Sequence, residues 1–219
     1  MLPLASLAVL LLAYLIGSIP VGVLVGRVFG FDPRAVGSHN VGMTNVARAG
    51  GKGAAALTFA GDVLKGLVPI LIGYQLEVSQ SGMALIALAT LIGAVYSIFL
   101  GFSGGRGVAA ALGIWLGLAP GSVAPILLAV FVVVLAISRI VSLASITAAL
   151  ALPIVVALCA YEQFFLMSLA MAAIVVWRHR ENIRRLAAGT EPAIGRSAAQ
   201  SAAPMSNRPH FDQPPGDRV

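Results

Sequence analysis

The chain has 219 residues, of which 59% are hydrophobic and only 10% are charged, and its mean hydropathy is +0.96. A soluble domain of this size does not need so much apolar sequence, so the composition excludes an ordinary soluble enzyme and predicts an integral membrane protein. The net charge of +6 could suggest nucleic acid. The basic residues are scattered between apolar runs, however, so membrane topology explains them better and no nucleic-acid partner is expected.

Seven apolar segments follow one another and predict an all-α, polytopic fold with seven transmembrane helices. Their approximate bounds are residues 4–26, 54–75, 82–100, 108–119, 122–138, 141–160 and 163–177. The first run has no basic region before it and no clear small-residue cleavage site, so it is interpreted as a membrane helix rather than a signal peptide. Several segments are shorter than the roughly 20 residues that a span needs. Short helices beside glycine-rich loops favour backbone that lines a cavity within the protein.

The basic residues lie on one side of this predicted topology. With the C-terminus inside, every lysine and arginine except Lys65 falls in or at the edge of an inner segment, at 27–53, 101–107, 138–141 or 178–219. The outer connections, 76–81, 119–122 and 160–163, contain Glu77 and Glu162 and no basic residue. The positive-inside rule therefore predicts an external N-terminus and a cytoplasmic C-terminus.

Two further patterns concern helix packing and the end of the chain. Glycines recur at four-residue spacing, which predicts close helix contacts, at Gly22, Gly26 and Gly30 and again at Gly113, Gly117 and Gly121. From Pro192 the sequence becomes rich in Ala, Ser and Pro with little aliphatic bulk. We therefore expect a membrane domain over residues 1–191 and a disordered cytoplasmic tail over 192–219, in which His210 is inert.

Three inner segments carry unusually dense polar chemistry. They read GSHNVGMTNVAR at 37–48, GFSGGRG at 101–107 and WRHRENIRRLAAGTEP at 177–192. Because all three face the same side, they can converge. In the second, glycine amides precede a helix and flank Arg106, which is typical of an anion site. In the third, His179 and Asn182 lie three residues apart, on one face if helical. The shared chemistry is recognition of an oxyanion, most simply a phosphate.

Other polar residues have plainer interpretations. Asp62 and Lys65 lie three apart within the second span, where ionisable residues usually pair; a functional pair and a structural one are both open. Four arginines are interpreted as anchors at the inner membrane surface: Arg178, Arg180, Arg184 and Arg185. The sequence GGKG at 50–53 lacks the upstream glycine and the following Ser or Thr of a phosphate-binding P-loop. No HxxxxD acyltransferase motif and no cluster with metal-ligand spacing is present, so no metal site is expected.

The three polar motifs resemble those of the bacterial acyl-phosphate-dependent glycerol-3-phosphate acyltransferases, the PlsY family. The likeness covers roughly residues 14–192 in the same order, and DVLKG at 62–66 and SLASITAA at 142–149 add to it. It implies a seven-helix enzyme of the inner membrane with a cytoplasmic active site. Such an enzyme moves a fatty acyl group from acyl phosphate to the 1-hydroxyl of sn-glycerol 3-phosphate and gives lysophosphatidic acid and phosphate in phospholipid biosynthesis. The resemblance implies no cofactor, neither a coenzyme A thioester nor a metal.

The motifs and the resemblance together assign candidate residues. Catalytic roles are expected for Ser38, Arg48, His179 and Asn182. Substrate or phosphate binding is expected for Asn40, Thr44, Lys65, Gly104, Gly105, Arg106, Gly107, Ser142 and Glu181. The second motif departs from the family pattern, because Ala94 replaces a histidine, Ser103 and Arg106 replace lysines, and Ala110 replaces a hydroxyl residue. Restoring a lysine at Ser103 is therefore expected to tighten acceptor binding.

Alternative functions remain open from the sequence. A phosphate or organophosphate transporter could use the same anion-binding loops, although the chain shows no internal repeat and its polar motifs gather on one face. A divergent paralogue with a different acceptor would fit the altered second motif. The base that deprotonates the acceptor is either His179 or the acceptor's own phosphate. The sequence predicts neither the oligomeric state nor the preferred acyl-chain length.

Overall fold

The computed structural model describes residues 4–119 and 121–194, and in these the regular structure is entirely helical. The α-helices are α1 (Leu4–Ser18), α2 (Val21–Phe29), α3 (Met43–Gln75), α4 (Gln80–Val95), α5 (Val108–Leu118), α6 (Val123–Ser138), α7 (Val141–Leu158), α8 (Phe165–Arg178) and α9 (Arg180–Ala187). Two short 3₁₀ turns, η1 (Ile98–Leu100) and η2 (Glu162–Phe164), follow α4 and precede α8. The all-α expectation is confirmed.

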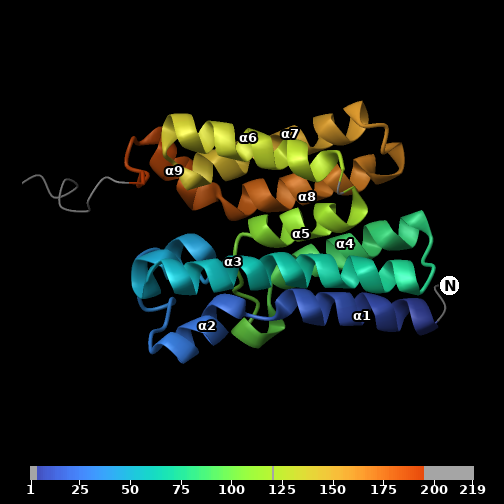
Figure 1. The fold of residues 1–219 in the computed structure, drawn as a ribbon, viewed down its shortest axis with the longest axis horizontal. Helices are drawn as coiled ribbons and strands as arrows, with labels where there is room; N and C mark the ends of the chain where they lie inside the picture. Colours follow the sequence, from blue (N-terminus) through green and yellow to red (C-terminus); the bar gives the residue numbers. More distant parts are fainter. Residues whose placement is uncertain (1–3, 120, 195–219) are drawn as a thin grey trace, which may run out of the picture.

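The long helices run side by side along one common direction (Figure 1). On one side of the bundle α1 packs against α4 and α3 against α5; on the other side α7 packs against both α6 and α8. Helix α5 lies between the two sides (Figure 1). The start of α1 and the end of α9 lie at opposite ends of the bundle, so the described chain begins at one end and finishes at the other (Figure 1).

Four helical segments are long and apolar enough to cross a membrane: Leu7–Phe29, Met43–Gln75, Gln80–Leu100 and Val141–Leu158. Helices α5 and α6 are apolar but shorter. Large apolar side chains also stand exposed on the outside of the bundle, among them Leu158 (81% exposed) and Leu166 (79%). Water would disfavour so many exposed apolar groups, whereas lipid accommodates them.

Glycines let the helices approach to backbone contact. A Cβ added to Gly17 of α1 would collide with the Thr90 carbonyl of α4, and one on Gly93 of α4 would collide with the Tyr14 carbonyl of α1. Gly66 and Gly113 make the same kind of contact between α3 and α5. Of the glycines that the spacing singled out, four meet close neighbours (Gly22, Gly26, Gly113 and Gly117), whereas Gly30 and Gly121 face open space.

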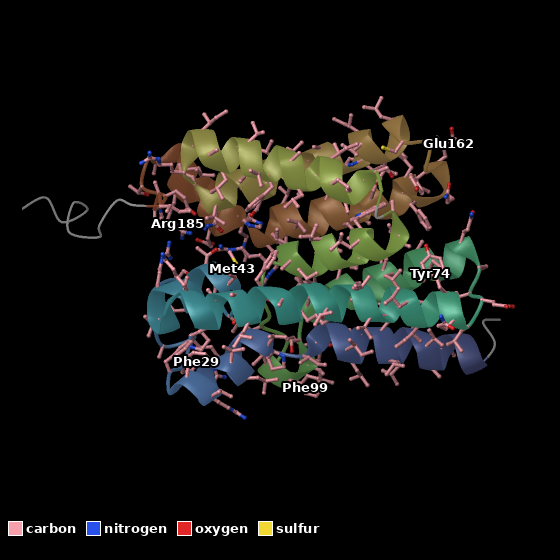
Figure 2. All side chains as sticks on the ribbon, in the orientation of Figure 1. Phe29, Met43, Tyr74, Phe99, Glu162 and Arg185 are labelled. Atoms are coloured by element: carbon pink, nitrogen blue, oxygen red, sulfur yellow. The ribbon has the colours of Figure 1, made fainter. Side chains whose placement is uncertain are left out.

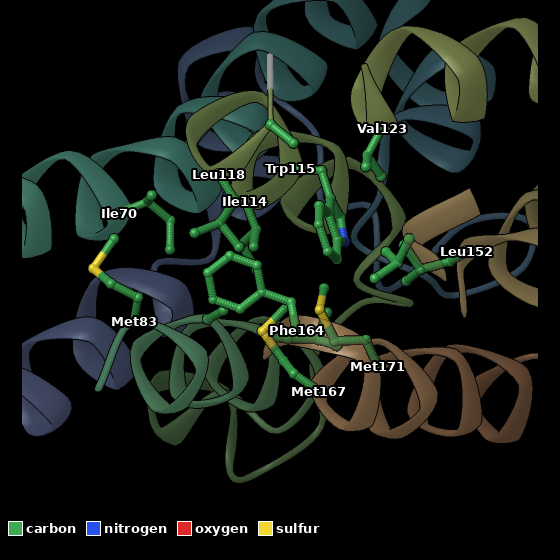
Figure 3. Packing of buried hydrophobic residues seen from close by; sticks show 14 of the residues in the cluster. Ile70, Met83, Ile114, Trp115, Leu118, Val123, Leu152, Phe164, Met167 and Met171 are labelled. Atoms are coloured by element: carbon green, nitrogen blue, oxygen red, sulfur yellow. The ribbon is translucent and has the colours of Figure 1, made fainter. Parts of the chain in front are cut away.

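The apolar core lies between α3, α4, α5, α7 and α8 (Figure 3). Trp115 is 1% exposed, and its ring meets that of Phe164 edge-on, with 6.3 Å between ring centroids and an angle of 85° between the planes. Methionines from α4 and α8 fill the space around these rings, as flexible side chains do in irregular gaps.

Three element boundaries differ from the sequence expectation. The first apolar run is not one helix, because α1 ends at Ser18 and α2 begins after Pro20. Helix α3 begins at Met43 rather than near residue 54, and Gly51 (φ 80°) introduces a kink within it. The predicted domain boundary at 191/192 falls within a segment that is still bound to the bundle, since the Ile194 amide donates to the Arg139 carbonyl at 2.7 Å. Most of the predicted tail, His210 included, lies outside the described residues.

Candidate functional site

A cavity of about 1390 Å³ opens among the polar segments, at the end of the bundle where α2, the start of α3 and α9 lie (Figure 1). Met43 on α3 and Arg185 on α9, both of which line it, are labelled at this end in Figure 2. The cavity brings together most of the sequence-predicted residues: Ser38, Asn40, Thr44, Arg48, Lys65, Gly105, Arg106, Gly107, Ser142, His179 and Asn182. The predicted convergence of the three motifs is therefore present in the structure.

Two predicted site residues lie outside this lining, Gly104 and Glu181. The Gly104 amide donates to the Val95 carbonyl at 3.1 Å, so it contributes to the loop's own fold. Glu181 is exposed and pairs with Arg184 at 3.1 Å. An exposed ion pair of this kind contributes little to stability and places the Glu181 carboxylate away from the cavity.

The segment that precedes α3 is shaped by Asn45, which the sequence reasoning passed over. This side chain is 1% exposed, accepts a hydrogen bond from the Ser38 amide at 2.9 Å, and donates to the Pro33 and Val36 carbonyls at 2.7 and 2.9 Å. Three hydrogen bonds from one buried amide hold the loop in a single conformation. Asn45 thereby sets the position of Ser38 at the edge of the cavity.

Backbone amides and carbonyls of the glycine loop before α5 both form hydrogen bonds with neighbouring helices. The amides of Gly104 and Gly105 donate to the last carbonyls of α4, at 3.1 and 3.0 Å, so they are not free to bind an anion as the sequence suggested. Their carbonyls accept from Arg178, at 2.8 and 3.3 Å. Arg178 also lies over the Tyr96 ring, 5.5 Å from its centroid. Its interpretation as a surface anchor is therefore wrong, because it ties the end of α8 to the glycine loop.

Arg106 projects from this held loop into the cavity. It has no hydrogen-bond or ion-pair partner among the described residues, and the same is true of Arg48 on the facing part of α3. Burial lowers the pKa of the Arg106 guanidinium, and the nearby Glu191 carboxylate opposes that effect. A guanidinium stays charged in proteins, so the cavity contains two cations ready to meet an anion.

The altered positions of the second motif divide between the cavity and the surface. Ala94 and Ala110 are buried and line the cavity. Ser103 is exposed and lies outside the lining. A lysine at position 103 would therefore lie on the exposed surface of the loop, outside the cavity.

His179 is buried at the junction of α8 and α9, with 1% of its surface exposed. Its Nδ1 lies 2.8 Å from the Val175 carbonyl. A carbonyl only accepts, so Nδ1 carries the proton and Nε2 keeps a lone pair. Burial lowers the pKa of the imidazole to about 4, with Arg106 adding to this effect and the Val175 hydrogen bond and Glu191 opposing it. His179 is therefore neutral at physiological pH.

Glu191 is a member of the site that the sequence reasoning assigned no role. Its carboxylate accepts from Ser142 Oγ, Asn182 Nδ2 and Arg185 Nε, each at 2.6 Å. Burial raises the pKa of Glu191, but these hydrogen bonds outweigh burial and hold the pKa below its ordinary value. The carboxylate thus joins α7, α9 and the segment 189–194 across one wall of the cavity. Its place near the end of the third motif, in GTEP, was the only signal available in the sequence.

Deeper in the cavity, Lys65 forms an ion pair with Asp62 at 2.8 Å. Lys65 Nζ also donates to the Ile19 carbonyl at 3.1 Å, at the break between α1 and α2, where the same carbonyl accepts from the Val21 amide at 3.0 Å. Lys65 therefore lines the cavity, and the Asp62 carboxylate balances its positive charge. Among the described residues no group of His, Cys, Asp and Glu side chains could hold a metal ion.

Comparison with known proteins places this architecture in a family. Residues 7–189 match the family model described as glycerol-3-phosphate acyltransferase. A glycerol-3-phosphate acyltransferase of Geotalea daltonii is 49% identical over 185 residues, which cover 84% of this chain and 95% of that protein. One of Thioalkalivibrio sulfidiphilus is 46% identical over 196 residues, which cover 86% and 93%.

Two crystal structures of the integral membrane glycerol 3-phosphate acyltransferase PlsY (YgiH) are similar as well. The glycerol 3-phosphate form has a TM-score of 0.83 and 39% identity, and the match covers 87% of this chain and 96% of that one. The lysophosphatidic acid form has a TM-score of 0.82 and 38% identity, with the same coverage. The all-helical fold with its long apolar segments, the family model and these relatives agree: the chain is an integral membrane protein that belongs to the glycerol-3-phosphate acyltransferase family.

Proposed function

We propose that this enzyme transfers a fatty acyl group from acyl phosphate to the 1-hydroxyl of sn-glycerol 3-phosphate, releasing lysophosphatidic acid and inorganic phosphate. The observation that carries the proposal is the cavity in which two guanidinium groups, Arg48 and Arg106, share the walls with a neutral histidine, His179, and have no partner within residues 4–119 and 121–194. Both proposed substrates bear phosphate, so these two cations suit them. The chain's membership of the family and its likeness to the glycerol 3-phosphate and lysophosphatidic acid forms of PlsY support the choice of acceptor and product.

Phosphate binding is assigned to the wall formed by the first two motifs. Arg48 and Arg106 supply charge, and hydroxyls of Ser38 and Thr44 add neutral donors at the same cavity. The first amides of α5 have no partner within their helix and also border the cavity at Val108 and Ala109. As the phosphate leaves the acyl carbon, negative charge gathers on it, and donors fixed in advance stabilise that charge without reorganising.

The acceptor hydroxyl must lose a proton as it attacks the acyl carbonyl. His179 Nε2 has the free lone pair for this step, and the low pKa keeps it unprotonated at neutral pH. The phosphate of the acceptor is the alternative base. The two routes differ in how strongly the rate depends on His179.

The same proposal includes a topology of seven spans with an external N-terminus and a cytoplasmic active site at the plasma membrane. Its support is the opposite placement of the two chain ends (Figure 1) and the gathering of basic residues at the end that holds the cavity. Cysteine labelling tests it in a Cys159→Ala background. Ser79→Cys, between α3 and α4, should react with an impermeant maleimide in intact cells, whereas Ala188→Cys should react only after lysis. The reverse pattern would overturn the orientation.

The activity is tested with purified protein, palmitoyl phosphate and radiolabelled glycerol 3-phosphate. We expect labelled lysophosphatidic acid with palmitoyl phosphate, little or none with palmitoyl-CoA, and the same rate after EDTA treatment. Equal rates with the two donors would contradict the acyl-phosphate assignment while leaving the acyltransferase activity intact. No product from any donor would contradict the proposed function itself.

A further inference from the structure

Beside the proposed active site lies a second cavity, of about 520 Å³. Residues of the segment 189–194 border both cavities, and the rest of the second one is lined by the turn between α6 and α7, at 137–140, and by Leu186 of α9. The hydrogen bond from the Ile194 amide to the Arg139 carbonyl joins the segment to the turn. A volume of this size is typical of ligand-binding pockets, and the proposed acyl transfer does not use it.

Arg139 is the only basic residue of the described chain that lines this second cavity. Its side chain forms no hydrogen bond or ion pair within residues 4–119 and 121–194. The backbone of Arg139 has φ 59° and ψ 17°, the left-handed conformation in which helices usually end with glycine or asparagine. An arginine is unfavourable in this conformation, so the geometry of the turn does not explain the residue. A ligand for its guanidinium would.

The charges around the second cavity suit an anion with a single negative charge. Glu191 also lines it, but this carboxylate forms an ion pair with Arg185 at 2.6 Å and accepts from Ser142 and Asn182. The pair of Glu191 and Arg185 is neutral overall, which leaves the positive charge of Arg139. A guanidinium binds phosphate oxygens through two parallel hydrogen bonds. A phosphodiester has one negative charge and balances Arg139, whereas a phosphomonoester approaches two at neutral pH.

The apolar residues of the second cavity indicate that this phosphate belongs to a lipid. Ile137, Leu186 and Ile194 line it, and Ile137 is 81% exposed. Four residues earlier on α6, Val133 is 55% exposed, so the two side chains form one apolar face that lipid chains cover in a membrane. Helix α6 ends at Ser138, which places Arg139 where this apolar face stops. Basic pockets between membrane helices bind lipid head groups at this level.

We propose that the second cavity binds an anionic membrane phospholipid with a phosphodiester head group. The lipid phosphate pairs with Arg139, and an acyl chain lies against Ile137 and the exposed face of α6. Because Arg139 is hydrogen-bonded to the segment 189–194, the bound lipid also supports this wall of the proposed active site. The inference is independent of the acyl-transfer proposal, since lipid binding needs no substrate.

The test measures lipid retention by native mass spectrometry of the purified full chain in detergent, with no substrate present. The protein receives phosphatidylglycerol or phosphatidylcholine with the same acyl chains. Both lipids have a phosphodiester, but only phosphatidylglycerol has a net negative charge. The first phosphatidylglycerol should bind about tenfold more tightly than the first phosphatidylcholine, because a hydrogen-bonded ion pair contributes at least about that factor. Equal retention of the two lipids would overturn the inference.

A matched pair of variants locates the site. Arg139→Gln and Lys52→Gln each remove one positive charge, but Lys52 is exposed on α3 and lines neither cavity. Arg139→Gln should abolish the preference for phosphatidylglycerol, whereas Lys52→Gln should keep it within about twofold. Equal losses in the two variants would mean general electrostatic attraction, and the inference would be wrong.

Two further measurements complete the test. Inorganic phosphate at millimolar concentration should leave the bound phosphatidylglycerol in place, because it lacks the acyl chains that the apolar residues hold. Displacement of the lipid would make the cavity a site for free anions and would overturn the lipid assignment. If Arg139→Gln did not fold, as judged by thermal unfolding in detergent, the comparison of the two lipids on the wild-type protein would still decide.

Discussion

Two of the buried polar atoms without hydrogen-bond partners lie in contrasting surroundings. Trp115 Nε1 is enclosed in the apolar core, where the indole meets Phe164 edge-on (Figure 3). Asn182 Oδ1 is equally buried, although its residue lines a polar cavity of about 1390 Å³. In the core an unpaired donor only costs stability, because side chains fill the space around it. Beside the cavity, the side chain with the unpaired oxygen also donates to Glu191 through its Nδ2, so it supports the cavity wall.

The contrast extends to whole regions of the molecule. Around Trp115, close glycine contacts and interdigitated apolar side chains fix the helices against one another. Around the cavity, the guanidinium groups of Arg48 and Arg106 have no partner in the described part of the chain, while Glu191 and Asn45 have three hydrogen-bond partners each. The side chains that are hydrogen-bonded within the protein stabilise the cavity wall, and the two guanidinium groups are expected to bind the substrate. Substitutions should therefore separate into those that lower stability and those that lower activity.

The largest expected effect on activity is that of His179→Gln. If His179 is the base, kcat/KM should fall by about 10²- to 10⁴-fold, the usual contribution of a positioned general base. Glutamine keeps a donor for the Val175 carbonyl, so the midpoint of thermal unfolding should change little. Initial rates with palmitoyl phosphate and thermal unfolding in detergent measure the two quantities. A loss of less than tenfold would assign the proton to the acceptor's phosphate instead.

A substitution in the apolar core is expected to lower stability and to leave activity almost unchanged. Trp115→Ala should lower the free energy of unfolding by about 3–5 kcal/mol, since it leaves a large cavity in a packed interior. The protein that remains folded should keep kcat/KM within about twofold, because the residue does not line the site. Trp115→Phe should cost much less, since it removes the unpaired N–H and keeps most of the ring volume. A large loss of activity in folded Trp115→Phe would contradict the expectation that core substitutions lower stability but leave activity unchanged.

Much of this arrangement could be predicted from the sequence. Hydropathy predicts the apolar helices, because lipid and core alike select long runs of apolar residues. The three polar motifs were predicted to converge because they fall on one side of the topology. The start of α3 was missed because TNVARAGGKG is polar and glycine-rich, which suggests a loop; the structure accommodates it in a helix that kinks at Gly51.

Two of the residues whose roles were missed act through contacts distant in sequence. Arg178 binds the carbonyls of Gly104 and Gly105, more than 70 residues away, whereas its position after an apolar run suggested only a membrane anchor. Glu191 joins Ser142, 49 residues away, to α9. No periodicity or local spacing encodes such contacts. They appear only when packing brings the segments together.

Arg106→Ala tests the cation side of the cavity. Hydrogen bonds to charged groups are worth about 1.5–3 kcal/mol, so kcat/KM should fall by about tenfold to a hundredfold. Arg106→Lys should retain much of the activity because the charge persists. An unchanged rate for Arg106→Ala would remove the glycine loop from the proposed site.

The structure reverses the expectation for the neighbouring position. Ser103 lies outside the cavity, so Ser103→Lys should leave KM for glycerol 3-phosphate within about twofold, in contrast to the tighter binding that the sequence suggested. The variant makes a matched control for Arg106→Ala, because it changes the charge of the same loop by one unit on its outer side. A clear fall in KM for Ser103→Lys would show that the loop's exposed face also contacts the acceptor.

Acid stability sharpens the comparison at one residue. In the folded protein His179 has a pKa of about 4, below the ordinary value of 6.5, because burial disfavours its charged form. Between pH 6.5 and 4 the unfolded chain binds a proton that the folded chain excludes, so stability is retained above pH 6.5 and lost as the pH falls through this window, by up to about 1.4 kcal/mol per pH unit. Glu191, whose pKa is held below its ordinary value of 4.5, loses its contribution as the pH falls through that value, so the points from pH 5.5 to 7.5 report chiefly on His179. Thermal unfolding in detergent at pH 4.5, 5.5, 6.5 and 7.5 should therefore show a midpoint that falls with acidity for the wild type and for the exposed-site control His39→Asn, and a flatter one for His179→Gln. Parallel curves for all three proteins would mean that the pKa of His179 is the same in the folded and unfolded chain, so that burial does not exclude the proton.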